Sequence, residues 1–147
     1  MATYLNPGPV FGPVRSRRLG VSLGVNLAPA DGKRCSFDCV YCENGTNDER
    51  PTSSPWPTAT QVAEALGARL RDMSAAGEPP DVITLAGNGE PTANPEFPEV
   101  VDAVLSLRDE LCPKARVAVL SNATMAHVPA VRDALLRVDD NILKLDT

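Results

Sequence analysis

The chain has 147 residues, of which 43% are hydrophobic and 22% are charged, and its net charge is -5. This composition is ordinary for a soluble globular protein, and the length predicts a single domain. No run of eighteen apolar residues is long enough to span a membrane, and residues 1–20 lack the apolar stretch of a secretory signal. We therefore expect a cytoplasmic protein that makes no contact with a membrane.

The charge is distributed unevenly along the chain. Basic residues outnumber acidic ones in residues 1–34, and the reverse holds in residues 35–147. A uniform nucleic-acid-binding face is therefore not expected. The basic residues of the first segment, Arg15, Arg17, Arg18, Lys33 and Arg34, form a local basic patch near the cysteines, or the arginines form an ordinary solvated surface.

Strand-like and helix-like patterns alternate along the chain. Apolar residues alternate with polar or small ones from Val21 to Leu27, which predicts a strand that ends at Pro29. Further strands are predicted at 82–86, 117–120 and 142–145. Three helices are predicted between the strands. The first begins at Thr58, the second begins at Asn94, and the third covers about 129–137.

Local signals mark where the first two helices begin. Thr58 and Gln61 fit a capping box. Asn94 followed by Pro95 is typical of a helix N-terminus, and Pro98 allows a start one or two residues later. The side chains expected to face the core are Val62, Leu66, Leu70 and Met73, then Phe97, Val100, Val101, Val104, Leu105 and Leu111, then Val131, Leu135 and Leu136.

The resulting order is β-α-β-α-β-α-β, which predicts an α/β fold with a parallel sheet and right-handed crossovers. In such sheets ligands bind at the carboxyl ends of the strands. The chemically suggestive segments all follow predicted strands, so they are expected to meet at one rim.

The long connection at residues 28–57 contains three closely spaced cysteines, Cys35, Cys39 and Cys42. Irregular loops of this length are usually functional. Three thiolates in a C-x3-C-x2-C run can hold three corners of a [4Fe-4S] cluster and leave the fourth iron open to a substrate or cofactor. The sequence therefore predicts a cluster-binding loop.

Two other interpretations of the cysteines remain open. A structural zinc site needs a fourth ligand, and the candidates, His127 and Cys112, are distant in sequence. A thioredoxin-like pair formed by Cys39 and Cys42 would leave Cys35 unexplained. Cys112 is otherwise expected to fill the core as a small apolar side chain, and His127 to lie on a surface loop.

The cysteine run, with Tyr41 before its last member, resembles the signature of the radical S-adenosylmethionine superfamily. The Gly-Asn-Gly-Glu-Pro run at 87–91 is similar to that superfamily's glycine–glutamate motif after the second strand. The spacing of the two motifs and the β/α order also match, and the resemblance extends from about Gly12 to the end of the chain. It implies the N-terminal part of a partial (β/α)6 TIM-like barrel.

The resemblance implies a [4Fe-4S] cluster and S-adenosyl-L-methionine as cofactors. The reduced cluster would cleave S-adenosylmethionine to a 5′-deoxyadenosyl radical, which abstracts hydrogen from an unknown substrate. The electron would come from a flavodoxin-like or ferredoxin-like reductant. Implied contacts to the cofactor come from Gly87, Asn88, Gly89, Glu90 and Pro91, with Asn88 standing where many relatives have a smaller residue.

Further positions are carried over from the same resemblance. Tyr41 is implied to pack near the adenine of the cofactor or to cover the cluster. Ser121 and Asn122 resemble the polar pair that ends the third strand, and Lys144 and Asp146 alternate on the last strand. The segment from Arg15 to Gly20 is similar to a branch related to wyosine-type tRNA-modifying enzymes, which would make RNA a possible substrate.

The predicted elements supply only about half of such a barrel, so we expect a fragment of a longer enzyme. Two other classes of function remain open. A non-catalytic iron–sulfur or zinc module would bind a partner through the sheet edge and ignore S-adenosylmethionine. An RNA-binding module would use the basic N-terminal segment, and its binding would fall steeply with salt.

Overall fold

The computed structural model describes residues 4–144. Its elements are β1 (Val10–Ser16), β2 (Gly20–Asn26), α1 (Ala59–Ala75), β3 (Val82–Ala86), the 3-10 turn η1 (Pro91–Ala93), α2 (Phe97–Leu111), β4 (Arg116–Ser121), α3 (Pro129–Arg137) and β5 (Asp140–Leu143). No helix within residues 4–144 has the length and apolar character needed to cross a membrane.

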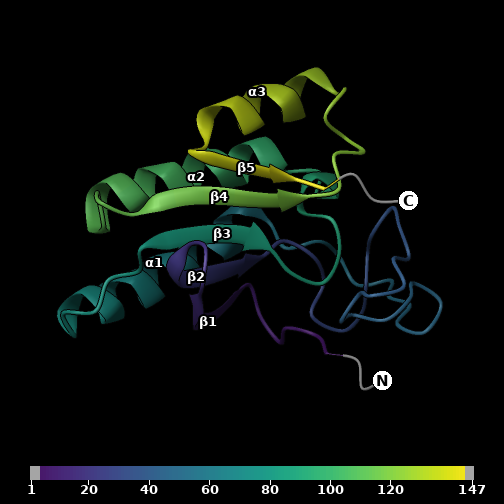
Figure 1. Ribbon diagram of the computed structural model, residues 1–147, viewed down its shortest axis with the longest axis horizontal. Coiled ribbons are helices and arrows are strands. Elements are labelled where there is room, and N and C mark those ends of the chain that lie inside the picture. The colour runs from purple at the N-terminus through teal and green to yellow at the C-terminus, as the bar shows by residue number, and fades with distance from the viewer. Residues whose placement is uncertain (1–3, 145–147) are drawn as a thin grey trace.

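The five strands form one mixed sheet in the order β1-β2-β3-β4-β5. The pairs from β2 to β5 are parallel, whereas β1 is antiparallel to β2. In the view of Figure 1, α1 and α2 lie behind the sheet and α3 lies above β5, and the carboxyl ends of the parallel strands all point toward one side. The α/β class and the parallel pairing of the four predicted strands are therefore confirmed, although the last strand begins at Asp140 and residue 145 of its predicted range lies outside the described residues.

Strand β1 was not predicted from the sequence. It contains Gly12 and Pro13, and its pairing with β2 is irregular between Phe11 and Val14. Proline has no backbone donor and is tolerated in strands mainly at edges and bulges. The edge position of β1 explains why a segment with weak strand character can still pair.

The core lies between the sheet and the helices. Val25 and Leu85 are fully buried there. The predicted inward faces of α1 and α2 are confirmed, with Leu105 and Leu111 partly buried at the margin. For α3, Val131 and Leu135 are buried as expected, but Leu136 is 74% exposed, so that prediction was wrong. The short helix has room for only a narrow apolar stripe.

The start of α1 agrees with the sequence signals, and α2 begins within the allowed range but with a different cap residue. The Thr58 hydroxyl accepts from Gln61 N at 3.1 Å, and Gln61 Oε1 accepts from Thr58 N at 2.9 Å, which completes the capping box. Helix α2 begins at Phe97 with Glu96 as its cap, so Asn94 is not the cap residue. The Asn94 side-chain amide instead donates to the carbonyls of Leu27 and Pro57, each at 2.9 Å.

Asp139, which lies just before β5, connects α2 to β4. Its Oδ2 accepts from Arg108 Nη1 and from Val117 N, both at 2.8 Å. Burial acts to raise the pKa of Asp139, but these two donors outweigh it and hold the pKa below the ordinary 3.8. The ionised carboxylate therefore stabilises the fold above pH 3.8, and this contribution is lost as the pH falls through the lowered value.

We expect the substitution Asp139→Asn to lower the melting temperature at pH 6, because a neutral amide accepts these hydrogen bonds more weakly than a carboxylate. The deficit should shrink as the pH falls below 3.8 and through the lowered pKa of Asp139, because the folded wild-type protein is protonated there only below that lowered value. Thermal melts of both proteins from pH 6 to pH 2 measure this. A deficit that stays constant over that range would contradict the expected role of the charge.

Candidate functional site

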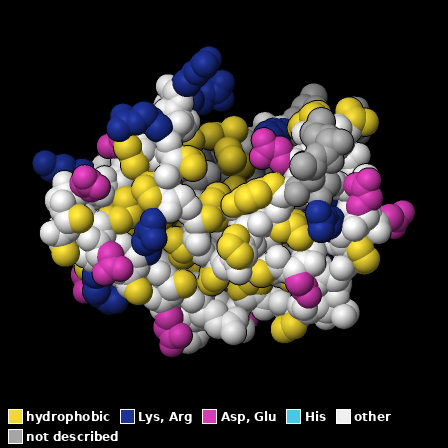
Figure 2. Space-filling view, turned by 90° about the horizontal axis from the view of Figure 1, so that it is seen from below, with side chains coloured by type: hydrophobic (Ala, Val, Ile, Leu, Met, Phe, Trp, Pro, Cys, Tyr) yellow, Lys and Arg dark blue, Asp and Glu magenta, His cyan; other side chains and the backbone are white. Residues whose placement is uncertain are grey.

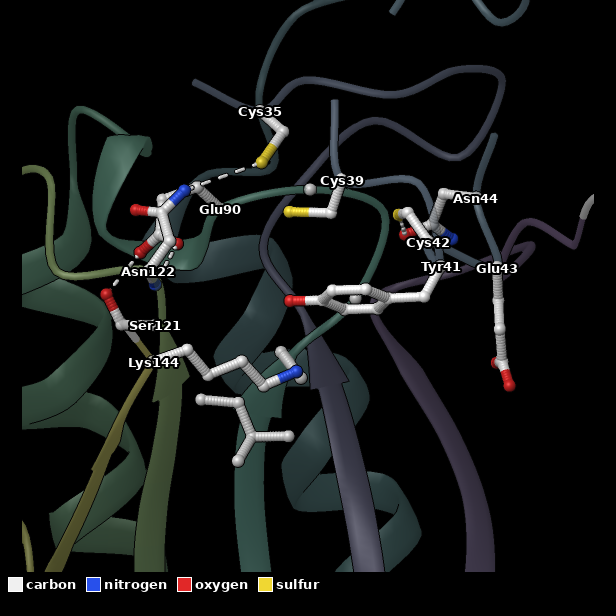
Figure 3. Close-up of a pocket in the computed structure, with 14 residues that line it drawn as sticks. Cys35, Cys39, Tyr41, Cys42, Glu43, Asn44, Glu90, Ser121, Asn122 and Lys144 are labelled. Carbon is white, nitrogen blue, oxygen red and sulfur yellow. Dashed lines mark hydrogen bonds between the residues drawn. The ribbon is translucent and has the colours of Figure 1, made fainter. Parts of the chain in front are cut away.

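A cavity of about 390 Å³ lies at the carboxyl ends of the parallel strands, under the cysteine loop (Figure 3). Side chains from the loop reach it from one side, and the ends of β3, β4 and β5 reach it from the other. The residues that line it are Cys35, Cys39, Tyr41, Cys42, Glu43, Asn44, Ala86, Gly87, Gly89, Glu90, Leu120, Ser121, Asn122 and Lys144.

Most of the predicted site residues therefore meet at one place. All three clustered cysteines line the cavity, and Figure 3 shows their sulfur atoms directed toward a shared space above the strand ends. Asn88 and Pro91 do not line it. Asp146 falls outside the described residues.

The cysteine loop is attached to the glycine turn by backbone pairing. Arg34 and Gly89 form a parallel β-bridge, in which Arg34 N donates to the Asn88 carbonyl and Glu90 N donates to the Arg34 carbonyl, both at 3.0 Å. Gly89 has a φ of +140°, and a side chain there would overlap the Arg34 carbonyl. Glycine is therefore required for the close approach, and the bridge places Cys35 beside Glu90.

Glu90 is almost completely buried, with 2% of its surface exposed. Its Oε1 accepts from the hydroxyls of Thr92 and Ser121, both at 2.6 Å, and from Thr92 N at 3.3 Å. Its Oε2 accepts from Asn122 N at 2.8 Å. A carboxylate has about four acceptor positions, so Oε2 retains the capacity to accept from a bound ligand.

The buried Lys33 side chain connects two parts of the cysteine loop. Lys33 is only 3% exposed, and its Nζ donates to Asp38 Oδ1 at 3.1 Å and to the Gly45 carbonyl at 2.7 Å. Burial alone would lower the pKa of Lys33, but the hydrogen bond to Asp38 and the nearby Cys42 raise it. Lys33 therefore remains charged. It links Asp38, which precedes Cys39, to Gly45, which follows Cys42.

Asn47 closes the same loop through backbone contacts. Its side chain exchanges two hydrogen bonds with the backbone of Cys35, each at 3.2 Å. It also donates from Nδ2 to Asp38 Oδ1 at 2.9 Å, while its backbone N donates to the same atom at 2.7 Å. These contacts hold the loop to the backbone of Cys35.

The thiols themselves have polar neighbours. Burial raises the pKa of the Cys35 thiol, although a backbone N–H from Phe37 and the charge of Lys33 oppose this effect. The side-chain amide of Asn122 donates to Cys35 Sγ at 3.6 Å. All four cysteines are free thiols. Within residues 4–144, no three His, Cys, Asp or Glu side chains are placed to hold a metal ion together.

Tyr41 and Lys144 cross the cavity from opposite sides. The Lys144 ammonium lies 5.8 Å from the centre of the Tyr41 ring, within range of a cation–π contact. Lys144 follows β5, and its backbone N donates to the Ser121 carbonyl at 2.8 Å. Both side chains are exposed, so this contact lies at the open side of the cavity.

Asn88 stabilises the glycine turn by hydrogen bonds to neighbouring segments. Its side chain is fully buried and bonds to the backbone of Asn6 and of Pro29, while its backbone N donates to Asn26 Oδ1 at 2.9 Å. The sequence did not indicate this network, because Asn6, Asn26 and Asn88 are far apart and follow no common pattern. The same holds for Asn47, which resembles any polar loop residue, whereas Lys33 was expected only as one of the basic residues near the cysteines.

The basic residues at 15, 17 and 18 are exposed and lie at the turn between β1 and β2, at the opposite end of the sheet from the cysteine loop (Figure 1). They therefore do not form a patch beside the cysteines. On the face shown in Figure 2, Lys and Arg side chains are interspersed with Asp and Glu side chains. His127 is exposed in a turn, as expected.

Cys112 lies in the helix-side core with 5% of its surface exposed, and burial raises the pKa of its thiol. This placement confirms its expected role as a small apolar side chain. Neither Cys112 nor His127 lines the cavity with the three clustered cysteines.

Comparison with known proteins gives relatives whose names state no activity, with one exception. The chain is 33% identical over 141 residues to a UPF0026 protein of Helicobacter pylori. The aligned residues make up 96% of this chain and 43% of that protein. It is 36% identical over 142 residues to a UPF0026 protein of Methanocaldococcus jannaschii, covering 93% of this chain and 40% of that protein.

A third relative, the GTPase Obg of Brachyspira hyodysenteriae, is 32% identical over 139 residues, which are 93% of this chain and 19% of that protein. The chain thus spans less than half the length of these curated relatives. No family model matches the chain. No solved structure matches it.

Proposed function

We propose that this chain is part of a radical S-adenosylmethionine enzyme that binds a [4Fe-4S] cluster. The observation that carries the proposal is the meeting of Cys35, Cys39 and Cys42 with the glycine–glutamate turn in one cavity at the strand ends. Two motifs that are separated in sequence, and that both belong to the resemblance, share a single site. The loop and the turn are also joined directly by the Arg34–Gly89 bridge.

The residues present fit the proposed cofactors. The three thiols would each bind a different iron of the cluster, so their sulfur atoms need not converge on a single ion. When bound, the cluster and S-adenosylmethionine would supply the radical chemistry that abstracts hydrogen from a substrate. Glu90 Oε2 and the turn at Gly87 and Gly89 would accept hydrogen bonds from the amino group of S-adenosylmethionine.

The remaining parts of the proposal follow from the same assignment. The sheet would be the first portion of a partial (β/α)6 barrel in a longer protein. A flavodoxin-like or ferredoxin-like reductant would provide the electron, and the protein would act in the cytoplasm, where thiols stay reduced. The substrate class stays open, with RNA among the candidates.

Electron paramagnetic resonance of anaerobically reconstituted, reduced protein tests the proposal. We expect a four-iron signal that changes when S-adenosylmethionine is added, because an open iron would bind it. A signal that ignores S-adenosylmethionine would favour a non-catalytic iron–sulfur module. Zinc in place of iron would overturn the proposal, and salt-sensitive RNA binding that survives replacement of the cysteines would favour an RNA-binding module.

A further inference from the structure

The side chain of Asn122 has only one possible orientation. Thr124 donates to Asn122 Oδ1 from its backbone N at 3.1 Å and from its hydroxyl at 2.7 Å. A backbone N–H can only donate, so the side-chain atom facing it must be the amide oxygen. The amide nitrogen of Asn122 must then face the cysteine loop.

Both hydrogens of that amide nitrogen have acceptors. Asn122 Nδ2 lies 2.8 Å from Ser36 Oγ and 3.6 Å from Cys35 Sγ. Because the Thr124 hydroxyl hydrogen is used on Asn122, the Ser36 hydroxyl donates to Thr124 Oγ1 at 2.8 Å. The three side chains thus form a closed ring of hydrogen bonds, whose members polarise one another, and the second amide hydrogen points at the Cys35 sulfur.

The backbone around Asn122 is held equally firmly. Its N–H donates to the buried carboxylate of Glu90 at 2.8 Å. Ala123 adopts a φ of +65° and donates from its backbone N to the Ser121 hydroxyl at 3.0 Å. A positive φ is uncommon for a residue other than glycine and persists only where neighbouring contacts impose it. These contacts fix the backbone of the turn after β4 in a conformation that directs the Asn122 side chain toward Cys35.

We propose that Asn122 is a positioning residue that raises the reduction potential of the cluster by donating an N–H···S hydrogen bond to Cys35. This inference rests on the proposed function and assigns Asn122 to the cluster, in addition to its place beside the S-adenosylmethionine site. A hydrogen bond to a ligating sulfur stabilises the form with more negative charge, which is the reduced cluster.

The test is a spectroelectrochemical titration of the reconstituted cluster, without S-adenosylmethionine or substrate. At a fixed potential, Asn122→Ala is expected to lower the ratio of reduced to oxidised cluster about tenfold, which is about 59 mV for a one-electron couple. Asn122→Asp keeps the acceptor for Thr124 and presents no N–H to the sulfur, so it should lower the potential at least as much. Ser36→Ala, which leaves the Asn122 N–H beside Cys35, should shift it by less than a third of that amount.

Separate outcomes identify which hypothesis fails. Failure of the wild-type protein to assemble a cluster would overturn both this inference and the proposed function. A wild-type cluster with unchanged potential in Asn122→Ala and Asn122→Asp, at equal iron content, would overturn this inference alone. Pulsed electron paramagnetic resonance of Asn44→Ala protein, labelled with ¹⁵N at the asparagine side chains, tests the contact even if both Asn122 variants fail to load, because this substitution removes the asparagine whose side chain contacts the Cys42 sulfur. A ¹⁵N coupling to the reduced cluster is expected, and its absence would overturn the inference.

Discussion

Replacement of Cys35, Cys39 or Cys42 with alanine is expected to reduce bound iron from about four atoms per chain, the content of one four-iron cluster, to less than about a tenth of that value. All three side chains line the same cavity and are free thiols. Loss of any one thiolate removes a cluster corner, and two remaining ligands bind the cluster far less tightly. Iron and sulfide analysis of anaerobically reconstituted protein measures the change.

Cys112→Ala provides the matched control, since Cys112 is the fourth cysteine and is buried in the core away from the cavity. It should keep the full iron content and lose only about 1 kcal/mol of stability from the small cavity that it creates. Iron content that falls equally in all four single variants would contradict the assignment. Full iron content in the variant lacking all three clustered cysteines would contradict it as well.

Gly89→Ala is expected to destabilise the fold by roughly 3 kcal/mol. The new Cβ would meet the Arg34 carbonyl, and the φ of +140° is unfavourable for any side chain. Backbone strain of about 1–3 kcal/mol adds to a steric cost of about 1–3 kcal/mol. Urea denaturation measures the loss in free energy of unfolding. Because the bridge to Arg34 would open, cluster assembly on the neighbouring Cys35 should also decrease.

Substitutions at two other glycines separate the backbone strain from the steric contact with Arg34. Gly77 has a φ of +71° and open space where a Cβ would lie, so Gly77→Ala should cost only the backbone strain, about 1 kcal/mol. Gly8 has open space and no positive φ, so Gly8→Ala should leave stability nearly unchanged. If Gly89→Ala were no more destabilising than Gly77→Ala, the contact with Arg34 would not require glycine.

Much of the architecture could be predicted because its signals are local. The strand at 82–86, the capping box of α1 and the bounds of α3 follow from residues that are adjacent or one turn apart. Helix α2 begins at Phe97, within the one or two residues that the sequence allowed, but its cap was misassigned because the Asn94 side-chain amide donates to Leu27 and Pro57. Strand β1 was missed because its pairing with β2, and not its own composition, makes it a strand.

The sequence by itself determined which side chains are candidates for the site and that they follow parallel strands, since residue spacing and strand order are properties of the chain. Only the tertiary structure decided how these residues touch. The buried Lys33, the Arg34–Gly89 bridge and the Asn122 contact to Cys35 join positions up to 87 residues apart. Such contacts depend on the register between strands and on the path of a long loop. Neither is encoded in a local pattern, because both result from packing the whole chain around one core.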